Sequence, residues 1–403
     1  MSILGNIMTL VALPWFVLET TGSAGQTGLT GMAFALPAFL AGIFGGVLVD
    51  RLGGRTMAII SDVISGLSVA CIPLFFNANL LPFGLFLGFT FASAIFDVPG
   101  LTARRIMLPE MARKNHVQPE AMNSWFEVMQ SLAIVVGPAL AGFAIAWFGA
   151  INLLWLNAAT FLASATLLYF FNREVGQPVN LPSSHEHGFQ SWSQDVLAGF
   201  RFLKGDSLLL VLALILTVFN FLGATITTIV MPVYIDDRYG TATRLGVLLT
   251  AIGIGNLIGG LLFASVGYRL RPYRKWVMLV GLAVWGLMQW LLVPQLAFGV
   301  LLALVFIAGF LEGPVNPLLV TVRMERIPEH LRGRVFGTFT AMAQVATPIG
   351  MVVTGALLER SGINTGIIIL AATYTVLVVG LLFVRSLNEM NRVVCDDQPA
   401  TDS

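Results

Sequence analysis

Long apolar segments of helix length dominate this chain and limit what it can fold into. A helix needs about 20 apolar residues to cross the hydrocarbon core of a bilayer, and only helices or closed barrels satisfy their backbone polar groups there. We find such segments near residues 3–20, 27–49, 57–76, 82–103, 122–147, 150–171, 208–234, 244–267, 276–294, 296–321, 335–358 and 363–384. The chain contains 57% hydrophobic and only 11% charged residues, which excludes a soluble protein whose whole surface faces water. The sequence predicts an all-α integral membrane protein with twelve transmembrane helices.

Positive charge is distributed asymmetrically among the segments that join these spans. All 22 lysines and arginines except Arg238, Arg244 and Arg360 lie in alternate loops or in the C-terminal tail. Positively charged loops are retained in the cytoplasm. We therefore expect both termini to be cytoplasmic, in a multi-pass protein of the bacterial inner (plasma) membrane.

One long polar interval divides the spans into six and six. We expect an N-terminal six-helix half, a cytoplasmic linker, a C-terminal six-helix half and a cytoplasmic tail, at residues 1–171, 172–206, 207–384 and 385–403. The linker ends in an amphipathic pattern at helical spacing, formed by Trp192, Val196, Phe200 and Leu203. This pattern predicts a helix at the membrane interface.

The two halves share a pattern where the fourth and tenth spans end. Asp97-Val98-Pro99 is followed by Pro109-Glu110, and Glu312-Gly313-Pro314 is followed by Pro328-Glu329, at an offset of 215 to 219 residues. An acid two residues before a proline, then Pro-Glu, indicates a duplicated six-span unit and two pseudo-symmetric halves.

Several motifs resemble one transporter family. The segment GVLVDRLGGR, residues 46–55, resembles the signature of the major facilitator superfamily, with Gly54 where a basic residue is common. The segment GPALAG, residues 137–142, resembles the fifth-span motif of its exporters, and its packing residues would be Gly137, Pro138 and Gly142. The segments ALPWFVLETTGS, DVPG, LPE and RGRVFG, which begin at residues 12, 97, 108 and 332, are similar to the drug and siderophore exporters, which include macrolide-efflux and enterobactin exporters. The resemblance implies efflux of drugs or secondary metabolites by a rocking motion of the two halves.

The signature segment suggests a latch that closes the cytoplasmic side. Its glycines permit close packing and a tight turn, its acid can meet the N-terminal end of a helix near Gly333, and its arginines can reach acids in the next span. The expected members are Gly46, Asp50, Arg51, Gly53, Arg55 and Asp62. The alternative is that the arginines only anchor the topology.

Two acids within the spans are candidates for proton coupling. Glu312 lies about 16 Å along its helix from the next arginine and Asp97 about 10 Å, so Glu312 is the deeper of the two. Burial of a carboxylate in lipid is costly and favours its protonated form. The alternatives are structural: Asp97 belongs to the latch network with Arg104 or Arg105, and Glu312 bonds to the broken helix beside Pro314.

An apolar central cavity is expected to take the substrate. Aromatic and methionine side chains suit bulky lipophilic ligands without strict geometry. The candidates are Trp15, Trp125, Phe219, Asn220, Phe221 and Met342. The alternative for each is packing between helices or contact with lipid.

Other kinds of chemistry lack their motifs. The sequence contains no phosphate-binding loop, no His-Glu-x-x-His, no catalytic serine-histidine set and no dinucleotide fingerprint, and His185 and His187 lack a third metal ligand. With a net charge of +1, nucleic acid is not an expected partner. We expect no cofactor, no metal and no enzyme activity, and an ion gradient as the energy source.

The sequence thus predicts a monomeric secondary exporter of amphipathic small molecules, working by proton antiport and alternating access. Two alternatives stay open: a dedicated siderophore, metabolite or lipid exporter of the same fold, and a non-transporting membrane sensor. The first span begins almost at Met1, without the basic lead-in that is usual in the resembling family, so we expect either a truncated chain or a different start.

Overall fold

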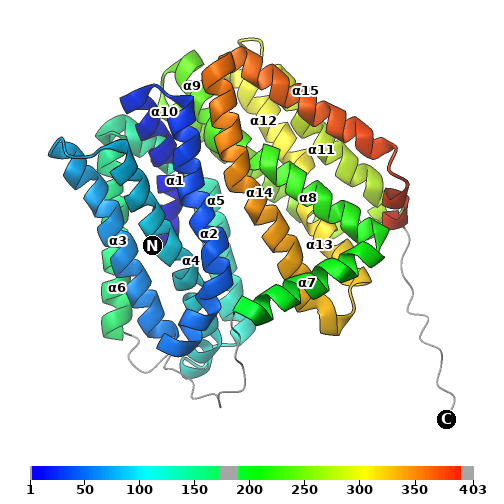
Figure 1. The fold of residues 1–403 in the computed structure, drawn as a ribbon, viewed down its shortest axis with the longest axis horizontal. Coiled ribbons are helices and arrows are strands. Elements are labelled where there is room, and N and C mark those ends of the chain that lie inside the picture. Colours follow the sequence, from blue (N-terminus) through cyan, green and yellow to red (C-terminus); the bar gives the residue numbers. More distant parts are fainter. Residues whose placement is uncertain (1, 172–188, 392–403) are drawn as a thin grey trace.

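The computed structural model describes residues 2–171 and 189–391, and all regular structure within them is helical (Figure 1). The first half consists of α1 (Ser2–Thr21), α2 (Ala24–Leu52), α3 (Gly54–Asn77), α4 (Phe83–Lys114), α5 (Pro119–Phe148) and α6 (Ala150–Phe171). The helix α7 (Phe189–Gly205) follows. The second half consists of α8 (Ser207–Thr225), the π-helix η1 (Ile226–Val230), α9 (Met231–Tyr239), α10 (Ala242–Val266), the 3₁₀ turn η2 (Gly267–Tyr273), α11 (Arg274–Leu291), α12 (Phe298–Glu312), α13 (Val315–Arg326), η3 (Glu329–Leu331), α14 (Arg332–Ser361), α15 (Ile363–Leu382) and η4 (Arg385–Asn391).

The described helices are consistent with twelve spans. Ten helical stretches within the described residues are long and apolar enough to cross a membrane. The stretch Ala242–Leu291 contains two predicted spans, α10 and α11, separated by η2. The 29-residue α2 matches the remaining predicted span. The predicted all-α class is confirmed.

Helix ends differ more from the prediction than helix positions do. The fourth span was expected to end near residue 103, but α4 continues to Lys114 through Pro99 and Pro109. A helix can continue beyond the apolar region, because its backbone hydrogen bonds form equally well where the side chains are charged. Hydropathy alone therefore does not mark the end of the helix. Three of the short connections between helices consist of a single glycine with a positive φ: Gly53, Gly149 and Gly362 have φ of 80°, 81° and 77°. Any residue with a side chain would be strained in this backbone conformation.

The amphipathic linker helix α7 lies across one end of the second half, against α8 and α14 (Figure 1). Leu203 is fully buried there, and Gly199 contacts α14 so closely that a Cβ atom built on it would lie 2.8 Å from the carbonyl oxygen of Arg334. The side chains of Trp192 and Val196 lie outside the described part of the chain. We call this end of the molecule the α7 end.

The two halves make their closest contacts toward the opposite end. There α2 packs on α14, where a Cβ atom on Gly28 would lie 3.0 Å from the Cα of Gly355, and α5 packs on α10. The N-terminus of α2 is tied to α14 as well, because Glu359 accepts hydrogen bonds from the Ser23 hydroxyl and the Gly25 amide, each 3.1 Å long. Figure 1 shows α2 and α14 diverging toward the α7 end, where no atom lies within 4 Å of a Cβ built on Gly333.

Candidate functional site

A cavity of about 330 Å³ lies among the helices of the second half. Its walls come from α8, η1, α10, α11, α12, α13 and α15, so segments far apart in the sequence contribute to it. Its aromatic and strongly polar side chains are those of Phe219, Asn220, Asn256, Trp285, Glu312, Asn316 and Tyr374. Among the described residues that line it, none is lysine or arginine.

Glu312 supplies the carboxylate of this cavity. It is the last residue of α12, and the helix breaks after it at Gly313 and Pro314 before α13 begins. The break lies against α10, since a Cβ atom on Gly313 would overlap the carbonyl oxygen of Asn256. The Asn256 side chain lies next to the Glu312 carboxylate, and Tyr374 is close enough to be influenced by its charge. A carboxylate with a neighbouring amide thus lines the cavity.

Aromatic side chains form the apolar part of the wall. The rings of Phe219 and Tyr374 meet edge to face with their centroids 4.8 Å apart. Trp285 is 8% exposed and packs within the same wall. Aromatic surfaces and a few polar groups characterise sites for small organic molecules.

The structure brings together three sequence candidates in this cavity: Phe219, Asn220 and Glu312. Four cavity candidates do not line it. Trp15 belongs to the buried core at 3% exposure and donates from its indole nitrogen to Glu19 at 2.6 Å, and Trp125 is 64% exposed on α5 in the other half.

Phe221 and Met342 also lie elsewhere. Two residues beyond Phe219 is more than half a helical turn, and the Phe221 backbone lies beside α14, where a Cβ atom on Gly350 would overlap its carbonyl oxygen. Met342 is on α14, which does not contribute to this cavity. Sequence reasoning missed the lining residues Asn256, Trp285 and Tyr374. Only Asn256, a polar residue inside a glycine-rich apolar segment, carried a detectable signal.

Asp97 lies in a different environment, within the first half. It is partly buried on α4, the Asn6 side chain lies near its carboxylate, and the charges of Arg104 and Asp62 act on it. Arg104 donates directly to Asp62, which is 1% exposed. The expected pairing of Asp62 with Arg51 or Arg55 is therefore wrong, because a residue of α4 occupies that position.

The signature arginines have other surroundings. Arg55 donates to the carbonyl oxygens of Leu168 and Tyr169 at 3.1 and 2.7 Å, so it caps the C-terminal end of α6, where carbonyl groups lack helical partners. Arg51 is exposed. Gly46 and the Asp50 side chain lie outside the part of the chain whose surroundings are described, and among the described residues no atom beyond the backbone of its own helix lies within 4 Å of a Cβ built on Gly333.

The exporter-motif residues lie at the contact of α5 with α1 and α10. A Cβ atom on Gly137 would be 2.6 Å from Ile7 of α1, and one on Gly246 of α10 would overlap the carbonyl oxygen of Pro138. The glycines Gly142 and Gly246 face each other with a separation of 3.0 Å between a built Cβ and the opposite Cα. No side chain separates the two helices here.

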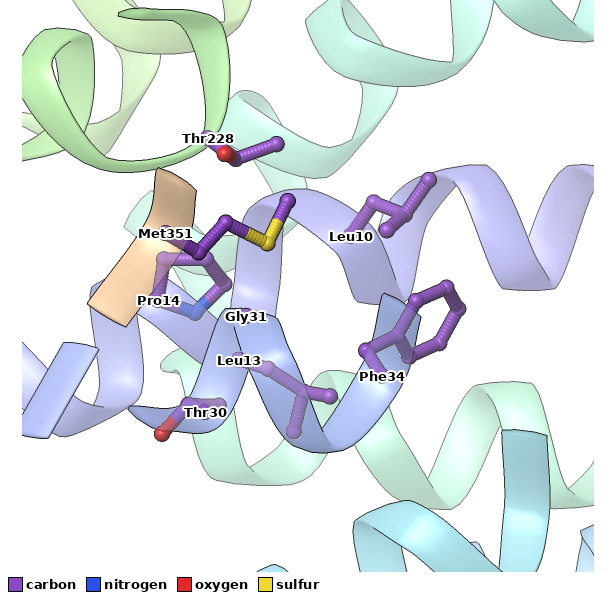
Figure 2. Close-up of a pocket in the computed structure, with 8 residues that line it drawn as sticks. All are labelled: Leu10, Leu13, Pro14, Thr30, Gly31, Phe34, Thr228 and Met351. Atoms are coloured by element: carbon purple, nitrogen blue, oxygen red, sulfur yellow. The ribbon is translucent and has the colours of Figure 1, made fainter. Parts of the chain in front are cut away.

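A second, much smaller cavity lies where the halves meet (Figure 2). Its volume is about 30 Å³, and its lining is apolar apart from two threonines: Leu10, Leu13, Pro14, Thr30, Gly31, Phe34, Thr228 and Met351. Met351 reaches from α14 to α2, with its sulfur 2.9 Å from a Cβ built on Gly31. The space suits a methyl group or one water and is too small for a drug-sized ligand. Within the described residues, no group of three or more His, Cys, Asp and Glu side chains is arranged to hold a metal.

Comparison with known proteins decides the family. The family model of the Major Facilitator Superfamily matches residues 1–228 and 213–393. The chain belongs to the Major Facilitator Superfamily. It is a multi-pass membrane protein of a family of transporters.

Curated relatives extend over nearly the whole of this superfamily member. The multidrug efflux pump Tap of Mycolicibacterium fortuitum is 32% identical over 391 residues, covering 96% of this chain and 94% of that protein. The same-named pump of Mycobacterium tuberculosis is 30% identical, covering 96% and 90%. The enterobactin exporter EntS of Escherichia coli O1:K1 / APEC is 28% identical, covering 95% and 88%.

Solved structures agree with the fold. The nucleoside transporter NupG superposes with a TM-score of 0.73 at 14% identity, covering 94% of this chain and 97% of that chain. A D-xylose-proton symporter superposes with a TM-score of 0.67 at 14% identity, covering 98% and 97%. At these identities the likeness shows the fold alone.

Proposed function

We propose that this superfamily member is a secondary active exporter of amphipathic small molecules, drugs included, and that it exchanges them for protons without chemical conversion. The observation that carries the proposal is the Glu312 carboxylate, which opens on an aromatic cavity with no lysine or arginine among its described lining residues. The likeness to multidrug efflux pumps over 96% of the chain supports the same substrate class.

The cavity chemistry supports exchange because one group serves two ligands. An ionised Glu312, steadied by Asn256, attracts a cationic or hydrogen-bond-donating group of a substrate whose apolar body contacts Phe219 and Trp285. A protonated Glu312 has lost that charge and holds the substrate weakly. Proton and substrate therefore compete for the cavity, and competition for one site is sufficient to couple opposite fluxes.

We place the α7 end in the cytoplasm, together with both termini, because 19 of 22 lysines and arginines belong to the loops and tail expected there. The closest contacts between the halves then lie toward the outer face. The conformation described here would be the one that releases a proton to the cytoplasm and accepts substrate from it. Rocking of the halves would expose the cavity to the outside, where protonation of Glu312 discharges the substrate.

The latch belongs to the other conformation in this scheme. When the α7 end closes, Asp50 would approach the first turn of α14 near Gly333, and Arg51 would lie at the same contact. Gly46 and Gly53 would permit the close approach of α2. We propose that one copy of the chain is sufficient for the cycle.

Asp97 is the second candidate for coupling. Its position beside the Arg104–Asp62 ion pair favours a supporting role over exchange, because Asp97 lies in a charge network of the first half and is not among the residues that line the cavity. The two roles are distinguished by the substitutions described next.

The test uses inverted membrane vesicles energised by a proton gradient, with ethidium as a fluorescent lipophilic cation. We expect the wild-type chain to accumulate ethidium and to dissipate the gradient when ethidium is added. Glu312→Gln should reduce both at least tenfold and should weaken ethidium binding to the purified protein, because the neutral amide resembles the protonated carboxyl. The matched control is Glu120→Gln, which removes an exposed carboxylate at the start of α5 and should transport normally.

Three outcomes would change the proposal. If Asp97→Asn abolishes coupling and Glu312→Gln does not, the coupling acid is in the first half. If uptake is unchanged without a gradient, proton exchange is wrong. If unrelated lipophilic compounds fail to compete with one another, a dedicated metabolite exporter is favoured, in line with the likeness to an enterobactin exporter.

A further inference from the structure

An apolar groove of about 430 Å³ lies on the second half, away from the cavity that contains Glu312. It runs between α10 and α11 and ends at the 3₁₀ turn η2. Its walls include Leu262, Trp276 and Val280, which are 49%, 54% and 45% exposed. These residues are exposed and belong to a stretch that is apolar enough to span a membrane, so we expect the groove to face the hydrocarbon of the bilayer.

Local structure explains why the groove exists. Gly259 brings α10 onto α12, where its Cβ would overlap the carbonyl oxygen of Phe310. Beyond this contact, the seven residues of η2 connect α10 to α11. The floor between the two helices is formed by Phe310, Leu311 and Pro314 at the break between α12 and α13.

Positive charge gathers at the η2 end of the groove. Arg269 and Arg271 are exposed residues of η2, which forms this end of the groove through Leu270 and Tyr273, and Arg269 donates to the Tyr268 hydroxyl at 2.8 Å. The nearby acid is Glu325. It is held by Arg274 through two hydrogen bonds of 2.6 and 2.7 Å and also feels the charge of Arg271. One carboxylate among three arginines leaves an excess of two positive charges in this described cluster.

The corresponding loop of the first half has a different charge pattern. Between α2 and α3 the sequence places Asp50 next to Arg51, whereas the segment from Ser265 to Arg271 contains arginines and no acid. The second-half arginines are therefore available for an external anion. Exposed Tyr268, Tyr273 and Trp276 lie beside them, as aromatic residues do at the level of lipid headgroups.

We propose that this groove is a binding site for an anionic phospholipid. One acyl chain lies along Leu262, Trp276 and Val280, and the phosphate accepts hydrogen bonds from Arg269 and Arg271. Guanidinium groups bind phosphate through charge-assisted hydrogen bonds, and each basic residue near an anionic lipid surface contributes to binding. A zwitterionic lipid can fill the groove with its acyl chain, but it has no net negative charge to balance the two excess positive charges of the arginine cluster.

The site has a mechanical relation to the cavity that does not depend on which substrate is carried. Leu311 and Pro314 touch the groove, and Glu312 and Val315 of the same segment touch the cavity. A lipid chain seated against the break would support it from the bilayer side. Loss of the lipid should then loosen the segment that holds Glu312.

The test measures quenching of tryptophan fluorescence by brominated acyl chains, with the full-length protein in phosphatidylcholine nanodiscs. Brominated phosphatidylglycerol should quench Trp276 at low mole fraction and saturate, whereas brominated phosphatidylcholine should quench in proportion to its amount. Trp276→Phe should remove the saturable part. The double variant Arg269→Gln with Arg271→Gln should weaken the apparent affinity for phosphatidylglycerol roughly 30-fold.

A matched control changes two exposed arginines at the same end of the molecule, Arg113→Gln with Arg201→Gln. It should leave the saturable quenching unchanged. The proposal is overturned if both lipids quench alike, since the groove is then only solvated by bulk lipid, or if the control lowers the affinity as much as the groove variant, since only the overall charge then matters. Inorganic phosphate at millimolar concentration should not displace the lipid; displacement would indicate an anion site without a lipid.

Discussion

Arg104 holds together the polar centre of the first half. It donates to Asp62, which is 1% exposed, and its charge acts on Asp97, which lies near the Asn6 side chain. One cation therefore balances two carboxylates that have little access to water. Breaking a buried pair by removing one partner is costly because a buried charge is left uncompensated.

Replacement of this cation should be strongly destabilising. We expect Arg104→Gln to lower the free energy of unfolding by roughly 3 kcal/mol, because it leaves two acids without a counter-charge. The adjacent Arg105→Gln removes a 49%-exposed arginine paired with exposed Glu127 and should cost less than about 1 kcal/mol. Thermal unfolding in detergent compares them. Addition of Asp62→Asn to Arg104→Gln should restore part of the loss, and the absence of any recovery would contradict the pairing.

Sequence reasoning located the acids but not their surroundings. Glu312 and Asp97 can be detected in the sequence because a carboxylate in an apolar segment is unusual at any position. The neighbours of Glu312 cannot be detected in this way, because Asn256 and Tyr374 lie on α10 and α15 and come close to it only through the packing of several helices. The pairing of Asp62 was predicted wrongly for the same reason: several arginines near one membrane edge are equivalent in sequence and distinct only in space.

At the scale of elements, the contact of α5 with α10 is made by backbone. Gly142 and Gly246 face each other, and the carbonyl oxygen of Pro138 fills the space where a side chain of Gly246 would be. The amide of Ala139 also donates across this contact to the Thr250 hydroxyl at 3.0 Å. Adding even one methyl group at Gly246 must therefore push the two helices apart.

A single added methyl group tests this contact. Gly246→Ala should lower the free energy of unfolding by about 1–3 kcal/mol through overpacking and reduce ethidium efflux. The control Gly88→Ala makes the same change in α4, where no atom lies within 4 Å of the new Cβ, and should be neutral or slightly stabilising because alanine favours the helix. Thermal unfolding and efflux are measured together. Equal behaviour of the two variants would show that the close contact is unimportant.

Helix positions followed from hydropathy, and helix ends did not. The apolar segments marked the position of every span, because crossing hydrocarbon requires a length of apolar sequence that nothing else in the chain has. The break between α12 and α13 was signalled by Pro314. The π-helical η1 was not predicted, because its sequence, with two threonines among apolar residues, is compatible with an ordinary α-helix.

At the scale of the whole molecule, the conformation can be trapped where the halves meet. A Cβ atom built on Gly25 of α2 would lie 3.7 Å from the Cβ of Glu359 on α14, which is close to the usual separation in a disulfide. In a background with Cys71→Ser and Cys395→Ser, the double variant Gly25→Cys with Glu359→Cys should form a disulfide spontaneously. It should abolish ethidium efflux under oxidising conditions and regain it with a reductant.

The two single-cysteine variants serve as controls and should transport in both conditions. Efflux that persists in the oxidised double variant, with cross-linking verified by mass spectrometry, would show that the halves need not separate here. The sequence predicted two six-helix halves from the repeat near residues 97 and 312. It could not predict which end of the molecule is closed. Loop charges determine the orientation of the chain in the membrane, but they do not determine which of the alternating conformations the two halves adopt.

The duplicated acid–proline pattern has different surroundings in its two copies, and this difference bears on how drug resistance evolves. Asp97 is tied to a network of buried charges, so substitutions near it endanger the scaffold. Glu312 lies in a wall of aromatic and amide side chains that carry no other charge among the described lining residues. Under selection for a new compound, laboratory variants with an altered spectrum should therefore accumulate around this cavity more often than around Asp97.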